Sequence, residues 1–221
     1  MENGYHKSLL AWVFVACGLW ASASAAHADE LFVRVFSNDQ KPVPGVAVFV
    51  RQQGSQRAQP ATGVMDQRDH RFVPHILIVQ KGAVVEFPNS DVVAHHVYSF
   101  SKPNNFELPL YKGSPPDPVL FEHEGVVTLG CNIHDGMLGY IVVVDTDTFA
   151  MTDADGLARL KVDGDAGRWE VNAWSPRIRD SRDPLVEVIE AGEPLTATFA
   201  LQKKLRPAHD DQSESVSWDD Y

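Results

Sequence analysis

The sequence is poor in cysteine, in positive charge and in long apolar runs, and each shortage narrows the possible functions. It has only 2 cysteines in 221 residues. Its 19 Lys and Arg are outnumbered by 30 Asp and Glu, which gives a formal net charge of −11. This acidity argues against nucleic acid and against anionic membrane surfaces as partners. No segment beyond the N-terminal region is long and apolar enough to span a bilayer.

The first 28 residues have the composition of an export signal. Lys7 supplies a positive start, Leu9 to Leu19 form a short apolar core, and Ala26-His27-Ala28 is a small-x-small cleavage site. Cleavage would make Asp29 the mature N-terminus and place the protein in the periplasm. An uncleaved anchor is the alternative, but the apolar core is short for a membrane span and Cys17 lacks the leucine of a lipoprotein signal.

Cleavage would leave Cys131 as the single cysteine of the mature chain. One cysteine cannot form an internal disulfide, and a spare thiol is a liability in an oxidising compartment. A lone cysteine is usually a small buried core residue. In an exported protein, a metal-bound thiolate explains Cys131 better than an idle thiol.

Short runs of Val, Ile, Phe and Thr alternate with Gly, Pro, Asn and Asp, which predicts an all-β protein with many turns. No long stretch has a helical period. The expected strands are Leu31–Phe36, Val46–Arg51, Ile76–Gln80, Val84–Phe87, His96–Ser99, Gly125–Leu129, Gly139–Val144, Ala158–Val162, Trp169–Trp174, Leu185–Ile189 and Leu195–Ala200. The proline-rich stretch Ser114–Pro118 cannot be a central strand and is expected to cross from one sheet to another.

The segment Gly130–Met137 brings together three metal-binding side chains, those of Cys131, His134 and Met137. The spacing Cys-x2-His-x2-Met is too tight for one strand, whose side chains alternate faces, but suits a short loop around one ion. A further imidazole is available upstream in the pair His95-His96. Two histidines, one cysteine and a weak axial methionine are the ligand set of trigonal copper sites.

From Phe72 to Val144 the sequence resembles the cupredoxins, most closely the amicyanin-like and plastocyanin-like members. The resemblance is carried by Phe-x-Pro, Val-x-Phe-x-Asn and Cys-x2-His-x2-Met pieces in this order. It implies a Greek-key β-sandwich with one type 1 copper ion. The ligands implied by the match are His95, Cys131, His134 and Met137. The surrounding wording is also similar to predicted secreted proteins grouped with methylamine utilisation.

The resemblance further implies that Asn89, six residues before His95, ties the two ligand loops together through backbone hydrogen bonds. Many cupredoxins have Asn after the first ligand histidine, whereas His96 follows here. Adjacent strand residues face opposite sides, so only one of the pair can reach the metal; the register favours His95. His96 is then a loop-bonding or surface residue. The histidines without such a combination are expected to be surface or hydrogen-bonded residues: His70, His75, His123 and His209.

The flanks of this segment resemble the two halves of one further sandwich, of the carboxypeptidase-regulatory-like or transthyretin-like kind. Lys41–Val48 reads as its first turn and strand, and Thr152–Leu160 as a later hairpin rather than a calcium loop. Each half has too few strands to bury two sheet faces, so we expect the cupredoxin unit to be inserted into this second, Ig-like sandwich. The expected parts are a signal (1–28), a first half-sandwich (29–63), the inserted unit (64–145), a second half-sandwich (146–203) and a disordered acidic tail (204–221).

The resemblance implies an electron carrier rather than an enzyme. Four good ligands leave no open position for a substrate, and no nucleophile–base pair stands out elsewhere. The electron would leave through the edge of His134, inside an apolar patch of Ile133, Gly136 and Leu138. A redox protein with a basic surface, a c-type cytochrome or a dehydrogenase, is the expected partner. Two alternatives remain open, a copper-delivery module with the same ligands and a metal-free β scaffold; the oligomeric state is not indicated.

Overall fold

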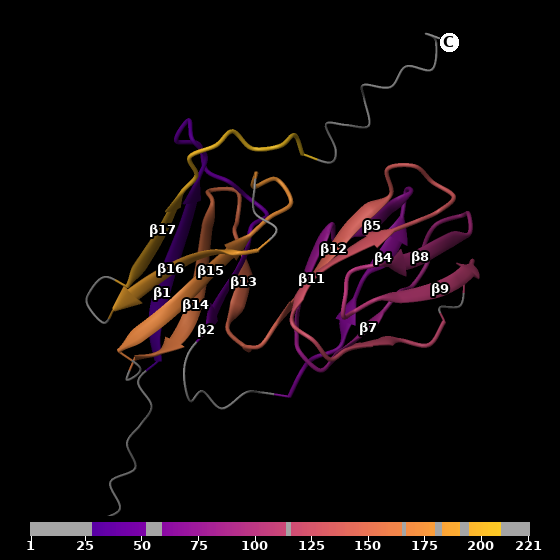
Figure 1. The fold of residues 1–221 in the computed structure, drawn as a ribbon, viewed down its shortest axis with the longest axis horizontal. Coiled ribbons are helices and arrows are strands. Elements are labelled where there is room, and N and C mark those ends of the chain that lie inside the picture. The colour runs from indigo at the N-terminus through magenta and orange to yellow at the C-terminus, as the bar shows by residue number, and fades with distance from the viewer. Residues whose placement is uncertain are drawn as a thin grey trace, which may run out of the picture.

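The computed structural model describes residues 28–51, 59–113, 116–164, 167–179, 183–190 and 195–208. All regular elements in these ranges are strands, which form two lobes side by side (Figure 1). The expected all-β class is therefore confirmed. The described residues include no helix long and apolar enough to cross a membrane. The expected export signal, apart from Ala28, lies outside the described residues, as do His209 and the tail beyond it.

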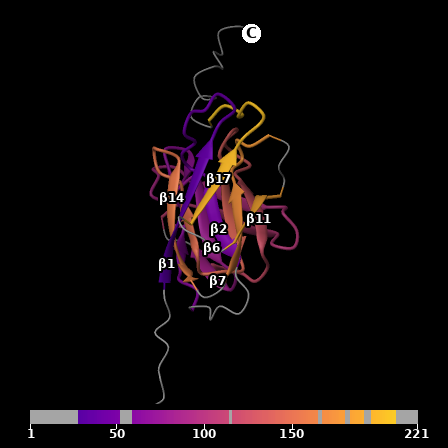
Figure 2. The same cartoon turned by 90° about the vertical axis from the view of Figure 1, so that its left-hand side faces the viewer.

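The first lobe, here the flanking lobe, is built from both ends of the described chain. Its three-stranded sheet has the order β14-β1-β17, with β1 (Ala28–Phe36) antiparallel to β14 (Leu157–Asp163) and parallel to β17 (Thr196–Ala200). Figure 2 shows β1, β14 and β17 together on the side of the molecule that this lobe occupies. Its four-stranded sheet has the order β13-β2-β15-β16. These strands are β2 (Ala47–Arg51), β13 (Phe149–Met151), β15 (Arg168–Trp174) and β16 (Leu185–Glu190).

The second lobe, here the central lobe, contains the strands from β3 to β12. A five-stranded sheet has the order β6-β12-β11-β8-β9, and a three-stranded sheet has the order β10-β7-β3. A separate hairpin is formed by β4 (Asp66–Arg68) and β5 (Arg71–Val73). The remaining strands are β3 (Gly63–Val64), β6 (Ile76–Gln80), β7 (Ala83–Glu86), β8 (His95–Ser99), β9 (Phe106–Tyr111), β10 (Val119–Phe121), β11 (Gly125–Gly130) and β12 (Leu138–Val144).

Each lobe has its own hydrophobic core, and a third cluster joins the two. The flanking core includes Val48 and Leu160, and the central core includes Phe72 and Ile141. The joining cluster consists of Ala47, Phe49, Ile76, Val142, Val144 and Trp174. Successive side chains of a strand point to opposite faces, so β2 and β12 each contribute to a lobe core on one face and to the joining cluster on the other. Burial on both faces explains why β2 and β12 are nearly continuous apolar runs rather than alternating ones.

The chain leaves the flanking lobe after β2 and returns to it at β13. Strands β1 and β2 accordingly pair with partners more than a hundred residues away in sequence, as in the pairs Leu31–Leu160 and Val48–Ala173. The turn Thr152–Gly156 connects β13 to β14 as a tight hairpin, in which the Asp153 carboxylate accepts the backbone N–H of Asp155. Independent folding of 64–145 stays a prediction.

Every expected strand overlaps an observed one, but the short strands β3, β4, β5, β9, β10 and β13 were not expected. The proline-rich excursion does pass between sheets, since β9 before it belongs to the five-stranded sheet and β10 after it to the three-stranded sheet. Pro109 lies within β9. It is tolerated there because β9 is an edge strand, where a missing N–H breaks no inner ladder.

Candidate metal centre

The loop 131–137 joins two adjacent antiparallel strands at one end of the central lobe. β11 ends at Gly130 and β12 begins at Leu138, and these two residues are paired. Gly136 has a φ of 79°, a left-handed conformation that suits glycine. The backbone N–H of Met137 donates to the carbonyl of His134 at 3.3 Å. A tight closed loop therefore presents Cys131 and His134 three residues apart.

The other histidine reaches this loop through a neighbouring strand of the same sheet. His95 begins β8, which is joined to β11 by the pair Tyr98–Gly130. A Cβ on Gly130 would lie 2.9 Å from the Tyr98 ring, so the absence of a side chain lets the two strands approach. His95 is completely buried and Cys131 is 9% exposed.

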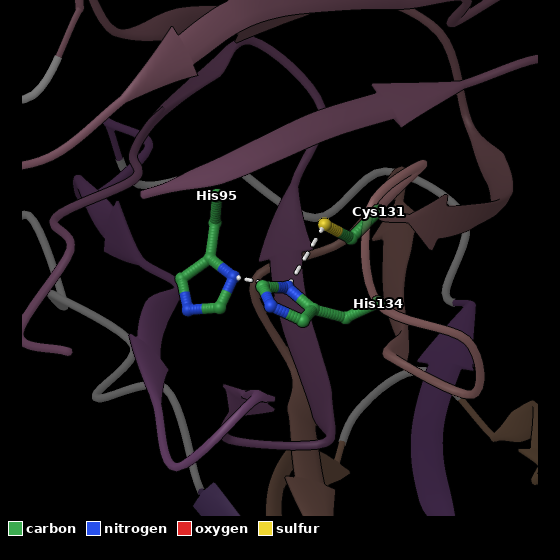
Figure 3. A group of neighbouring side chains, drawn as sticks. All are labelled: His95, Cys131 and His134. Atoms are coloured by element: carbon green, nitrogen blue, oxygen red, sulfur yellow. Dashed lines mark hydrogen bonds between the residues drawn. The ribbon is translucent and has the colours of Figure 1, made fainter. Parts of the chain in front are cut away.

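Three donor atoms converge at this point (Figure 3). The Nδ1 atoms of His95 and His134 lie 3.0 Å apart, and Nδ1 of His134 lies 3.7 Å from Sγ of Cys131. All three donors lie within 4.8 Å of one another. With metal–nitrogen bonds of ~2.05 Å and metal–sulfur bonds of ~2.3 Å, a trigonal site separates its nitrogens by ~3.6 Å and nitrogen from sulfur by ~3.8 Å. The donor set therefore fits a trigonal copper ion after the two imidazoles separate by about 0.6 Å.

Met137, the fourth expected ligand, is 3% exposed and belongs to the same core cluster as Cys131. It follows the loop's last glycine and directly precedes β12. Its place is compatible with a weak axial contact, a role that stays a prediction. Among the described residues, the group with metal-binding geometry is His95, Cys131 and His134.

A buried carboxylate orients His95, and the sequence reasoning missed it. Oδ2 of Asp91 lies 2.9 Å from Nε2 of His95 and accepts the backbone N–H of His70 at 3.0 Å. Its other oxygen accepts the N–H of Val92 at 2.8 Å. The His70 amide and the His95 ring hold the pKa of Asp91 well below its usual range. An ionised Asp91 keeps the proton of His95 on Nε2, so the lone pair of Nδ1 is directed at His134 and Cys131.

His70 also lies against the centre, contrary to the expectation of an unrelated surface histidine. The hairpin of β4 and β5 turns through Asp69 and His70, whose φ angles are 51° and 58°. Its ring centroid lies 4.5 Å from that of His134 and 5.7 Å from that of His95, in edge-to-face arrangements. Two non-glycine residues in left-handed conformation cost energy. Here they bring an exposed imidazole onto the outer face of the ligand loop.

The electrostatics of this cluster favour a neutral His134. Partial burial, followed by the neighbouring His70 and His95 rings, lowers the pKa of His134 below its ordinary value, while Asp91 acts in the opposite direction. A metal binds the unprotonated nitrogen of imidazole, so a lowered pKa keeps this donor available at neutral pH.

The neighbours of His95 differ from expectation in one respect. Nε2 of His96 lies 2.9 Å from a carboxylate oxygen of Glu107, away from the converging donors. The expected role of Asn89 as a link between the two ligand loops is wrong. Its amide donates to the carbonyls of Val93 and Tyr111, which uses both of its N–H groups within its own loop and β9.

The surface around His134 is partly apolar. Ile133 is 49% exposed, and Leu138 is partly buried. The other histidines lie apart from the three donors: the His75 ring packs edge-to-face on Tyr140, and the His123 carbonyl accepts a hydrogen bond from Asn104.

Neither a protein-family model nor a curated protein matches the sequence. Solved structures do match. A purple cupredoxin from Nitrosopumilus maritimus is 23% identical, with 38% of this chain and 99% of that chain covered at a TM-score of 0.33. A reduced Cu(I) form of amicyanin is 20% identical over 44% of this chain and 98% of its own, at 0.35.

A copper-containing nitrite reductase from Thermus scotoductus is 22% identical over 50% of this chain but only 28% of its own, at a TM-score of 0.36. These neighbours agree with the cupredoxin resemblance seen in the sequence. Their identities are too low to transfer a function, and their TM-scores are too low to add weight to the site. The function is therefore inferred from the contacts of the chain itself.

Proposed function

We propose that this protein is a periplasmic type 1 copper protein that carries single electrons between redox partners. The observation that carries the proposal is the convergence of two imidazole nitrogens and one thiol within 4.8 Å at the end of a rigid sheet. His95, Cys131 and His134 would hold the ion, and Met137 would supply the weak axial contact. Soft thiolate and imidazole donors in this trigonal set are typical of copper rather than of magnesium or calcium.

When bound, the copper would supply one-electron redox chemistry. The chain's contribution is to keep the donors in place during the change of charge. His95 is buried and fixed by Asp91, Cys131 is held at the end of β11, and His134 is packed under His70. Because no described ligand residue sits on a long flexible loop, little rearrangement is expected when the electron arrives or leaves.

The route to a partner is proposed to run through the outer face of His134. His134 is the least buried of the three donors, and exposed Ile133 and His70 lie beside it. An apolar contact there would bring a partner close, while the net charge of −11 would guide the approach of a basic redox protein such as a c-type cytochrome or dehydrogenase. No catalytic role is proposed, since four donors would leave no position for substrate.

A copper-delivery protein is the second candidate, because the same donors also bind Cu(I). The exposed edge at His134 would suit ligand exchange with a copper acceptor. Voltammetry and self-exchange measurements on the copper-loaded protein separate the two. A reversible potential with fast self-exchange supports the electron carrier. An irreversible response, together with rapid copper transfer to a Cu(I) chelator, would favour delivery instead.

A further inference from the structure

A cavity of about 460 Å³ lies between the two lobes, on the side of β12 where Leu138 begins the strand. The flanking lobe contributes Pro44, Met151 and Pro176, and the central lobe contributes Pro74, Ile76 and Tyr140. Ligand sites are commonly apolar concavities of this size at domain boundaries, with a few polar groups that orient the ligand. The walls of this cavity are mainly proline, aliphatic and aromatic side chains.

Two arginines provide the polar groups. Arg177 and Arg206 line the cavity together with Ser175 and His75. Nε of Arg177 donates to the carbonyl of Arg206 at 3.3 Å, and Nη1 of Arg206 donates to the carbonyl of Pro176 at 3.2 Å. In the part of the chain that the structure describes, neither guanidinium is paired with a carboxylate. The hydrogen bonds fix both side chains and leave further N–H donors for a ligand.

The same two arginines line a second cavity of about 650 Å³ beside the first. Its basic side chains are Lys41, Arg177, Arg179, Lys204 and Arg206, and its one carboxylate is that of Asp39, which pairs with Lys41 at 2.9 Å. This concentration of positive charge contrasts with the net charge of −11 of the whole sequence. Arg177 and Arg206 therefore stand where an apolar cavity meets a basic one.

We infer that this junction binds an amphipathic organic anion, with its apolar body between the lobes and a carboxylate on Arg177 and Arg206. The planar guanidinium fork matches a carboxylate, and the apolar walls exclude water from the contact. Bound ligand would touch Leu138, the residue after Met137, and would thereby connect the lobe boundary to the candidate metal centre.

The test uses the metal-free full-length mature protein with 2-naphthoate as the probe and 2-naphthamide as its neutral counterpart. Calorimetry should detect saturable binding of the carboxylate and much weaker binding of the amide. NMR shifts should concentrate at Tyr140 and Met151. Equal affinity for the two probes, or no binding of naphthoate, would overturn the inference.

Variants locate the site. Arg177→Gln and Arg206→Gln should each weaken naphthoate binding by about tenfold or more, the usual effect of losing a charge-assisted hydrogen bond. Arg34→Gln, which removes an exposed charge from β1, should have no effect. Met151→Trp should block the cavity while keeping both arginines, and so gives a result even if an arginine variant is misfolded; unchanged binding in this variant would contradict the site.

The inference does not depend on copper. Cys131→Ser should bind naphthoate as the parent does, so a failure of the copper proposal leaves this measurement interpretable. If the protein sediments with phosphatidylglycerol vesicles but binds no naphthoate, the basic surface recognises a lipid surface and the inferred small-molecule site is wrong.

Discussion

Replacing Asp91 by Asn should weaken copper binding by about 10- to 100-fold, or about 1.4 to 2.8 kcal/mol, the usual cost of losing a partner behind a metal-bound histidine. In the native chain three donors converge on this carboxylate, from His95, His70 and Val92. An amide has only one oxygen. If that oxygen faces His95, the amide nitrogen meets the N–H of Val92, donor against donor. If it faces Val92, the amide donates to Nε2 of His95 and drives the ring proton to Nδ1.

The second arrangement removes the lone pair that would bind the metal, so affinity falls although the ligands themselves are intact. The assay is competition for Cu(I) against a chelator, with folding followed by circular dichroism. Asp135→Asn is the matched control, since Asp135 is exposed in the metal loop and the charge change is the same. A folded Asp91 variant whose affinity matches that of the control would refute the role of Asp91.

Three further predictions address the ligands and the packing around them. His95→Ala should abolish copper binding, whereas His96→Ala should keep a coloured centre, because the His96 ring bonds away from the donors; the reverse result would place the wrong histidine in the site. In the metal-free protein, the NMR titration midpoint of His134 should lie below 6.5, because burial disfavours its charged form, and stability should fall as pH drops below that value; a midpoint at or above 6.5 would contradict its packing. Gly139→Ala should destabilise the fold by about 1 to 3 kcal/mol in urea, because its Cβ would lie 2.7 Å from the Phe72 side chain, and unchanged stability would argue against that contact.

The sequence predicted the long strands well because their patterns are strong. β6, β12 and β15 are rich in β-branched and aromatic residues, and burial on both faces made β12 a continuous apolar run. The short strands β4 and β5 have three residues each, too few to show a period. Pro109 lies inside β9 and hides that edge strand in a proline-rich region.

The candidate ligands could be read from spacing, but their surroundings could not. Cys131, His134 and Met137 lie within seven residues, and the cupredoxin resemblance supplied His95. His70 is brought to the site by a short hairpin whose position depends on tertiary packing, so no local pattern reveals it. Asp91 did leave a signal, as an acidic residue four positions before a candidate ligand. The pair of basic and apolar cavities arises from two distant parts of the chain and has no local signature.

The most direct test of the central claim is the visible spectrum of the purified protein after addition of Cu(II). Three converging donors that include a thiolate should give one bound copper per chain and an intense thiolate-to-copper charge-transfer band. Cys131→Ser should remain folded and lose that band. A parent protein that stays colourless with copper, or a Cys131→Ser variant that keeps the colour, would contradict the proposed type 1 copper centre.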